Sequence, residues 1–578
     1  MTDNATSDMP TAVSVVVSIP ELVGLIIAHS SKRSLLKLRL VSRLFSQACH
    51  PYFSVPLISN NPDSHWGKSP FYDAPGHLIQ SVCVAQYDAK YCSIIQSTFT
   101  ALEHLEVYVT NSPTAEPSTA ATSHMNLDPL FSSGSALEHR LNQVTITIMA
   151  EQDGEWDPWF LTGTHRDSDS SERTVFSQVT TLEIRTLKAS DRLWVRWATI
   201  DKLMRDVFPN LERLTFSRIK SSDNYTLGEY TLEREGGFII DGVASVKLTH
   251  LDLTDMSLSM EAICRLNTCF PNLERLAVRG FFSAQQTLGQ QNPAFVATPL
   301  TVKSFQLQFG TVDDVLMLLP LLDKVVDLAL LDLSRGSPTD LVDGFSKIAG
   351  RNRFKQLTFT GLMDMDIMNR EDTAALFQIE CFQSLERLTL RCHPSWVFLD
   401  LMPGTIPPAF LSTLEHLEFQ RLHFSSWMSV KDAVKFNAML NTMHRLKQLI
   451  VRTPVDGFEL FEGLGHDKTR LSGLADGWNY SQAWSHCLRD KSTGPWLETI
   501  EIFISCTHSL GIEPEEVEEF ILDRFSPWLE KVTISLYSDE PWGPSVEEPL
   551  EILQQWGDAT TEKRVASDGV QVLVEFRY

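Results

Sequence analysis

The pattern Φ-x-x-Φ-x-Φ, where Φ is an apolar residue, returns along the chain from about residue 78 to the C-terminus. Because side chains alternate between the two faces of a strand, the second and third apolar residues of each copy share one face. Each copy therefore predicts a short strand with one buried side. The clear copies are Leu102/Leu105/Val107, Leu211/Leu214/Phe216, Leu248/Leu251/Leu253, Leu273/Leu276/Val278, Phe354/Leu357/Phe359, Leu385/Leu388/Leu390, Leu414/Leu417/Phe419, Leu446/Leu449/Val451, Leu497/Ile500/Ile502 and Leu529/Val532/Ile534. The weaker copies are Ile79/Val82/Val84, Leu141/Val144/Ile146, Val179/Leu182/Ile184, Val302/Phe305/Leu307 and Val325/Leu328/Leu330.

The spacing between copies indicates a repeat unit that is longer than one strand. Most middle apolar residues lie about 23 to 39 residues apart, and the interval from Leu449 to Ile500 is about 51 residues. The segments 201–208 and 260–267 carry apolar residues at three- and four-residue steps, as an inward helix face requires. Stacked strand–helix units bury these positions in one continuous core. The sequence predicts a solenoid over residues 78–578, with an insertion or degenerate repeat near 456–495.

A different apolar pattern occupies the N-terminal part. Ser18 is a candidate helix cap, with Pro20 and Glu21 in the first turn, where proline and acid are favoured. A second apolar segment follows a break at 29–33. We expect a disordered tail over 1–15, a helical module over 16–58 and a linker over 59–77. A module this small leaves apolar surface exposed, which marks a protein–protein site.

The repeat part resembles the leucine-rich repeat family, specifically the irregular repeats of F-box proteins. The resemblance implies an α/β fold, a leucine-rich repeat solenoid of stacked strand–helix units. One slot departs from the family pattern, which places Asn or Cys three residues after the last apolar strand residue. That slot holds Ile219, Met256, Phe281, Leu333, Leu362, His393 and Leu422. The number of repeats and the curvature therefore stay open.

The N-terminal module resembles the F-box, an all-α module. The family order of Leu/Ile-Pro, Ile, Leu-x-x-Leu and Val-Ser-Arg-x-Trp/Phe is matched from Ile19 to Phe45. The resemblance implies binding to a Skp-family adaptor, and through it to a cullin. The adaptor-binding residues that it implies are Ile19, Pro20, Leu22, Ile26, Leu35, Leu38, Val41 and Phe45. The alternative is that these helices only cap the first repeat.

Composition narrows the partners and the setting. The 578 residues carry a formal net charge of −24, which argues against a general nucleic-acid binder and against docking on anionic membranes. The nine cysteines are odd in number and scattered, which favours a reducing cytoplasmic or nuclear setting. The N-terminus lacks the basic flank of a signal peptide, and no apolar run approaches the length of a membrane helix. We expect a soluble protein.

Catalytic and metal-binding motifs are absent from the sequence, so we expect no enzyme, no cofactor, no metal and no catalytic residue. Cys264, Cys269 and Cys381 are expected to be core cysteines, and Cys392-His393 is expected to pack at a strand end. The acidic run 513–519 is typical of a first helical turn. Other side chains that could contribute to a site, but are too dispersed or are expected in packing, are Trp156, Trp159, Trp194, Trp197, His466, Asp467, Trp478, Trp484 and His486.

The outward strand positions are polar and include several arginines despite the acidic total. The candidate target-binding residues are Arg213, Arg275, Arg279, Arg387, Arg391 and His416, with polar neighbours such as Thr215, Ser217, Gln356, Thr358, Thr360, Thr389, Glu418 and Gln420. An acidic or phosphorylated segment is one conceivable ligand, and an ordinary solvated face is the alternative. Together with these positions, the F-box resemblance implies the substrate-recognition subunit of a Skp–cullin–F-box ubiquitin ligase. The competing hypotheses are a repeat scaffold without ligase function and an enzyme within 456–495.

Overall fold

The structure is a computed structural model of the chain, which divides into two units, Met1–Leu273 (unit 1) and Glu274–Tyr578 (unit 2). It describes residues 54–57, 80–84, 95–97, 99–110, 137–149, 154–155, 175–186, 193–194, 197–218, 244–257, 260–279, 299–333, 338–360, 375–391, 409–420, 443–455, 497–505, 530–537, 555 and 573–577. The predicted tail (1–15), nearly all of the helical module (16–53), the linker (59–77) and the insertion (456–495) lie outside these residues.

The strands of unit 1 pair in parallel and in chain order. They are β1 (Ser54–Leu57), β2 (Ser81–Val84), β3 (His104–Thr110), β4 (Gln143–Met149), β6 (Thr181–Thr186), β8 (Arg213–Arg218) and β9 (His250–Ser257). A separate parallel pair joins β5 (Gly154–Glu155) to β7 (Leu193–Trp194). The helices of this unit are α9 (Trp197–Lys202), which runs into the π-helix η3 (Leu203–Val207), and α10 (Met260–Cys269).

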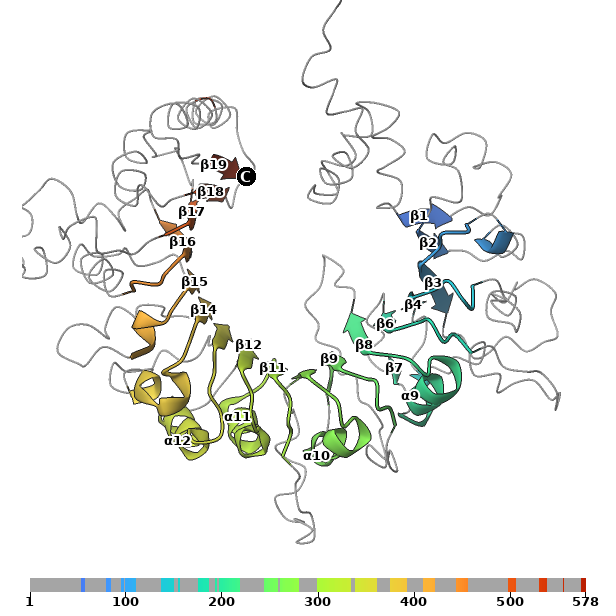
Figure 1. Ribbon diagram of the computed structural model, residues 1–578, viewed down its shortest axis with the longest axis horizontal. Helices are drawn as coiled ribbons and strands as arrows, with labels where there is room; N and C mark the ends of the chain where they lie inside the picture. The colour runs from blue at the N-terminus through green and yellow to red at the C-terminus, as the bar shows by residue number, and fades with distance from the viewer. Residues whose placement is uncertain are drawn as a thin grey trace, which may run out of the picture. The chain divides into compact units, whose positions relative to one another are not determined.

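Unit 2 repeats the same arrangement. Its parallel strands, again in chain order, are β10 (Arg275–Arg279), β11 (Ser304–Gln308), β12 (Asp327–Leu331), β13 (Gln356–Thr360), β14 (Arg387–Arg391), β15 (His416–Gln420), β16 (Gln448–Val455), β17 (Thr499–Ser505), β18 (Lys531–Tyr537) and β19 (Leu573–Arg577). The helices are α11 (Val312–Leu318), η4 (Leu319–Leu321), α12 (Pro338–Ile348), η5 (Glu380–Phe382) and η6 (Ala409–Ser412). Helices α11 and α12 lie on one side of the strands (Figure 1).

The strand pattern of the sequence is confirmed, and four further strands, β1, β5, β7 and β19, were missed. Every copy of Φ-x-x-Φ-x-Φ coincides with a strand, and the predicted helical segments 201–208 and 260–267 coincide with α9–η3 and α10. Strand β1 lies inside the range predicted as a helical module, so that prediction is wrong at 54–57. The residues Val55 and Leu57 alternate as in the later strands, and β2 provides the hydrogen-bonding edge that β1 needs. Strand β19 lies in the predicted array, which had no copy there.

The core consists of apolar residues that stack in register from strand to strand. In unit 1, Leu105 pairs with Val144, and Val144 pairs with Leu182. In unit 2, Leu357 pairs with Leu388. All five side chains are no more than 1% exposed. Since burying a side chain of this size stabilises a fold by about 1.5–3 kcal/mol, these aligned rows hold neighbouring repeats together.

A turn that begins with phenylalanine leads into several strands. In each, the N–H of the apolar residue three positions later donates to the phenylalanine carbonyl at 3.2 Å, as in the turns at Phe99, Phe176, Phe208 and Phe382. The phenylalanine rings are fully buried. In unit 2, the ring of Phe382 lies 5.0 Å from that of Phe345 between centroids, a distance at which aromatic pairs are favourable. The turn therefore adds an aromatic layer to the core beneath the strands.

Just before a strand begins, one backbone carbonyl accepts hydrogen bonds from two successive N–H groups at the start of the following strand. Glu103 O accepts the N–H groups of Asn142 and Gln143 at 2.9 and 3.1 Å. Lys355 O in unit 2 accepts those of Glu386 and Arg387 at 2.8 and 2.9 Å. Since both lone pairs of the carbonyl are used, each strand start is held in register with its predecessor.

Polar side chains bond to backbone carbonyls of the preceding repeat. They do so from a position before the strand, not from the Asn/Cys position that the leucine-rich repeat pattern places after it. Asn210 Nδ2 donates to Ser177 O at 2.6 Å, and Thr413 Oγ1 donates to Leu385 O at 2.8 Å. Both polar residues stand directly before the first apolar residue of their copies. Leu333, which occupies the family's Asn/Cys slot, is fully buried instead. These two bonds between repeats are thus made ahead of the strands, whereas Leu333 packs into the core.

Candidate interaction surface

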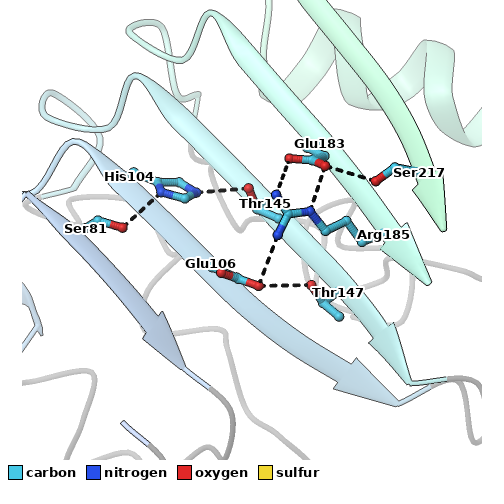
Figure 2. A network of polar contacts seen from close by, with 8 residues as sticks. All are labelled: Ser81, His104, Glu106, Thr145, Thr147, Glu183, Arg185 and Ser217. Atoms are coloured by element: carbon cyan, nitrogen blue, oxygen red, sulfur yellow. Dashed lines mark hydrogen bonds and ion pairs between the residues drawn. The ribbon is translucent and has the colours of Figure 1, made fainter. Parts of the chain in front are cut away.

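The strand residues between the buried apolar positions form what we call the polar face of each unit. In unit 1, register pairs Glu106 with Thr145, Thr145 with Glu183, and Thr147 with Arg185. These positions are brought to one side by the two-residue period of the strands. Figure 2 shows that their side chains contact one another across β3, β4, β6 and β8.

Arg185 is the centre of this network. Its Nε and Nη2 donate to the two carboxylate oxygens of Glu183, both at 2.7 Å, and its Nη1 lies 3.6 Å from Glu106 Oε1. Ser217 Oγ donates to Glu183 Oε1 at 2.9 Å, and Thr147 Oγ1 donates to Glu106 at 3.3 Å. The side chains of Glu106, Glu183 and Arg185 are 13%, 18% and 30% exposed. The two carboxylates therefore share one partly buried guanidinium.

Short side chains on β4 make this arrangement possible. Strand β4 lies between β3 and β6, yet Arg185 reaches Glu106 across it because Thr145 and Thr147 are small. The long side chains cover both threonines, which are fully buried. On the other side of Thr145, its Oγ1 lies 2.9 Å from His104 Nε2, while Ser81 Oγ lies 3.0 Å from His104 Nδ1. Two sets of side-chain contacts thus join neighbouring strands, one from β2 to β4 and the other from β3 to β8 (Figure 2).

The electrostatics match the burial of these groups. Burial opposes ionisation of Glu183, but the hydrogen bonds from Arg185 and Ser217 outweigh it, so the pKa of Glu183 is lowered. Burial lowers the pKa of His104, with Arg185 adding to the effect and Glu106 opposing it. Burial also raises the pKa of Cys83 to about 12, and the Glu106 carboxylate contributes to that rise. We conclude that Cys83 is a poor nucleophile.

The polar face of unit 2 has a different charge order. Its first row runs across the strands as Arg275, Ser304, Asp327, Gln356 and Arg387. Here the charged residues alternate with neutral ones. Among the described residues, no hydrogen bond or ion pair joins either arginine to another side chain. Next to the row, at what we call the rim, Lys303 pairs with Glu274 and Lys355 pairs with Glu386.

Asp327 is half-buried at the centre of this row. Burial raises its pKa, while the positive charges of Arg275 and Arg387 partly offset that effect. Since adjacent strands lie about 4.8 Å apart, each arginine stands about 10 Å from Asp327 along the row. Among the described residues no ion pair joins either arginine to Asp327, and both arginine side chains are exposed.

Four of the predicted target-binding residues lie at the surface or partly below it. Arg213, Arg275 and Arg387 are exposed at the first positions of their strands, as predicted. His416 is half-buried, with Nδ1 2.8 Å from Gln448 Oε1.

Arg279 corrects the prediction of an outward side chain. It is only 3% exposed, and its guanidinium carbon lies 5.4 Å from the centre of the Phe309 ring. Phe309 has a φ of 53°, and the face of its ring attracts the guanidinium group at this distance. Glu418, named as a polar neighbour, is also buried, at 6% exposure. The side chain of Arg391 and all eight predicted adaptor-binding residues lie outside the described residues.

Two of the described cysteines behave as core residues. Cys269 and Cys381 are buried, and burial raises their pKa values to about 11 and about 12. Within the described ranges, no group of three or more His, Cys, Asp or Glu side chains could hold a metal ion, and no helix is long and apolar enough to cross a membrane. The side chain of Cys264, the pair Cys392-His393, the acidic run 513–519, the histidines and aspartate of 456–495, and the side chains of the tryptophans named above fall outside the description.

The network of unit 1 was missed from the sequence. The signal was present in the residues between the apolar positions: Glu106, Thr145 and Glu183 each separate the last two apolar residues of a copy. The sequence shows that these residues are polar, but it does not show which of them face each other across the strands.

Comparison with known proteins adds little to this geometry. No family model matches the chain, and no curated protein sequence matches it. Among solved structures, the chain is similar to one titled as a complex of TLR13 with ssRNA13, with a TM-score of 0.36 and 14% identity. The likeness covers 80% of this chain and 53% of the other, so this chain spans about half of that protein. It is too distant to assign that protein's ligand to this chain.

The class of protein follows from the structure itself. Short parallel strands in chain order carry the leucine-rich pattern, and a polar face runs across them. The described residues of each unit form a leucine-rich repeat solenoid.

Proposed function

We propose that this protein is the substrate-recognition subunit of a Skp–cullin–F-box ubiquitin ligase. The F-box resemblance from Ile19 to Phe45 supports the adaptor-binding half of the proposal. The observation that carries the recognition half is the polar face of the repeats, where Arg213, Arg275 and Arg387 are exposed on regular strands. Side chains on a rigid scaffold are suited to binding because little conformational entropy is lost when a partner docks.

The proposed mechanism is one of proximity. The N-terminal helices bind the Skp-family adaptor and hence the cullin, while the repeats hold a target protein. Ubiquitin transfer by another enzyme is then favoured because the target has a high effective concentration near that enzyme. In this role the protein has no catalytic residue, needs no cofactor, and acts in the cytoplasm or the nucleus.

The test is co-purification of adaptor and cullin with the full chain. We expect Leu22→Asp and Ile26→Asp each to abolish recovery of both, because a buried charge is costly in an apolar interface. Lys32→Asp, outside the matched motif positions, is the control and should leave recovery intact. Circular dichroism should show unchanged strand content in every variant. Full recovery with both Asp variants would overturn the ligase assignment.

A leucine-rich repeat scaffold without ligase function is the second candidate. It is favoured by one observation: the fold and the exposed arginines belong to the repeats alone, and need no adaptor. In that case wild-type protein would capture its partners but would recover no adaptor or cullin.

A further inference from the structure

Five neighbouring strands of unit 2 carry a row of charges that is open to a ligand. We define the arginine row as Arg275, Ser304, Asp327, Gln356 and Arg387, which are matched in register from β10 to β14. Arg275, Gln356 and Arg387 are exposed, and the other two are half-buried. The row therefore presents two positive ends and one negative centre.

The surroundings leave these charges unneutralised. The next row along the same strands is Ala277, Gln306, Ala329, Thr358 and Thr389, none of which is charged. On the other side of the row, Lys303 pairs with Glu274 at 2.6 Å and Lys355 with Glu386 at 2.7 Å. The nearby rim lysines and glutamates are thus paired with each other rather than with the arginine row.

We infer that the arginine row binds an extended peptide segment with two acidic side chains six positions apart. Four strand spacings of about 4.8 Å place Arg275 and Arg387 about 19 Å apart. An extended chain advances about 3.3 Å per residue, so positions i and i+6 span nearly the same distance. Because six is an even number, both acidic side chains leave the peptide on one face. The inference rests on the proposed recognition role and specifies the target chemistry.

Arginine forms two parallel hydrogen bonds with a carboxylate or with a phosphoryl group, so the shared ligand chemistry is a pair of oxyanions. Asp327 sits midway between the arginines and would repel an oxyanion placed there. A peptide with an uninterrupted run of acidic residues could also reach both arginines, but it would place a negative charge against Asp327. Asp327 therefore disfavours such a peptide. The order of charge along the row, rather than its total, sets the specificity.

The test measures fluorescence anisotropy of labelled eleven-residue peptides with the full chain. The first peptide has Glu at its third and ninth positions in a Ser/Thr/Gly background; others place the two Glu residues two or four positions apart, or replace both by Gln. We expect the six-position peptide to bind about tenfold more tightly than the others. Equal affinity for all spacings would overturn the inference.

Protein variants then assign the binding to the row. Arg275→Gln and Arg387→Gln should each weaken binding about tenfold. Arg353→Gln, an exposed arginine in the turn before β13, is the matched control and should bind as wild type. Asp327→Asn should tighten binding about two- to threefold at low salt, because a repulsive charge is removed about 10 Å away. Binding that is insensitive to both arginine substitutions would contradict the inference.

A third arm distinguishes the two sources of oxyanion. Phosphoserine at both positions should bind more tightly than Glu if the natural target is phosphorylated, and no more tightly if it is acidic by sequence. Adaptor recovery is measured on the same variants. The arginine variants should retain the adaptor, so a failure of the peptide inference is separable from a failure of the ligase proposal.

Discussion

The polar faces of the two units lie on the same kind of parallel sheet, but their charged side chains differ in whether they pair with each other. In unit 1, Glu106, Glu183 and Arg185 stand close enough that one guanidinium serves two carboxylates. In unit 2, Arg275 and Arg387 each stand two strands from Asp327. The charges of Glu106, Glu183 and Arg185 are thus paired within the protein, whereas Arg275 and Arg387 face solvent.

This difference shows that the role of a charged strand residue depends on whether its side chain reaches a group of opposite charge. In unit 1, Arg185 pairs with Glu183 on its own strand and reaches Glu106 two strands away, and these partly buried bonds hold the strands together. Among the described residues of unit 2, Arg275 and Arg387 are exposed, no ion pair joins either of them to Asp327, and they remain available to a partner. We therefore expect substitutions in unit 1 to change stability and those in unit 2 to change binding.

The sharpest test removes one arginine from each face. Arg185→Ala leaves Glu106 and Glu183 without their shared counter-charge, so the free energy of unfolding should fall by about 2 kcal/mol. Arg387→Ala should change it by less than about 0.5 kcal/mol, because Arg387 is exposed. Urea denaturation and hydrogen exchange in β3, β4 and β6 measure the effect. Equal losses in both variants would break the comparison.

Acid should weaken unit 1 through His104. Because its folded pKa is lowered from the usual 6.5, the unfolded chain binds the proton first as pH falls. The contribution of His104 to stability is full above about pH 6.5 and is lost as pH falls toward the folded pKa. A Gln at this position should remove that dependence, at a cost of about 1 kcal/mol at pH 7.5 for altered hydrogen bonds. Denaturation midpoints between pH 7.5 and 5.5 check this; an unchanged slope in His104→Gln would contradict it.

The carboxylates of the two faces should respond with opposite signs. The pKa of Glu183 is lowered on folding, so its contribution is present above about pH 4.5 and is lost as pH falls through the folded value. The pKa of Asp327 is raised, so its ionised form destabilises the fold at neutral pH, and that cost disappears in acid. At pH 7, Glu183→Gln should lower the denaturation midpoint and Asp327→Asn should raise it slightly. Shifts of the same sign would be against this account.

The smallest effect is expected at the rim of unit 2. Lys303 pairs with Glu274 at 2.6 Å, but the side chains are 68% and 46% exposed. Exposed pairs of this kind contribute about 0.5 kcal/mol or less, so Lys303→Met should leave the urea midpoint nearly unchanged. A loss as large as that of Arg185→Ala would show that the rim is structural as well.

Much of the scaffold was predictable from the sequence because strands have a strict two-residue period. The copies at Leu105, Leu357 and Leu388 indicate where strands lie and which side is buried. Exposure at Arg213, Arg275 and Arg387 also followed from that alternation. The prediction failed at Arg279 because the ring of Phe309, which belongs to the next repeat, lies close to the guanidinium. It failed at 54–57 because β1 depends on the edge of β2 rather than on its own short sequence.

By itself, the sequence determined the strands, their buried sides and the leucine-rich repeat class, since each depends on residues that are close together in the chain. Only the tertiary structure decided that Arg185 reaches Glu106 over a pair of threonines, and that Arg275 and Arg387 stay apart. The physical reason is that side-chain partners across a parallel sheet are set by strand register. Register joins residues from separate repeats, and no local pattern encodes the distance between them.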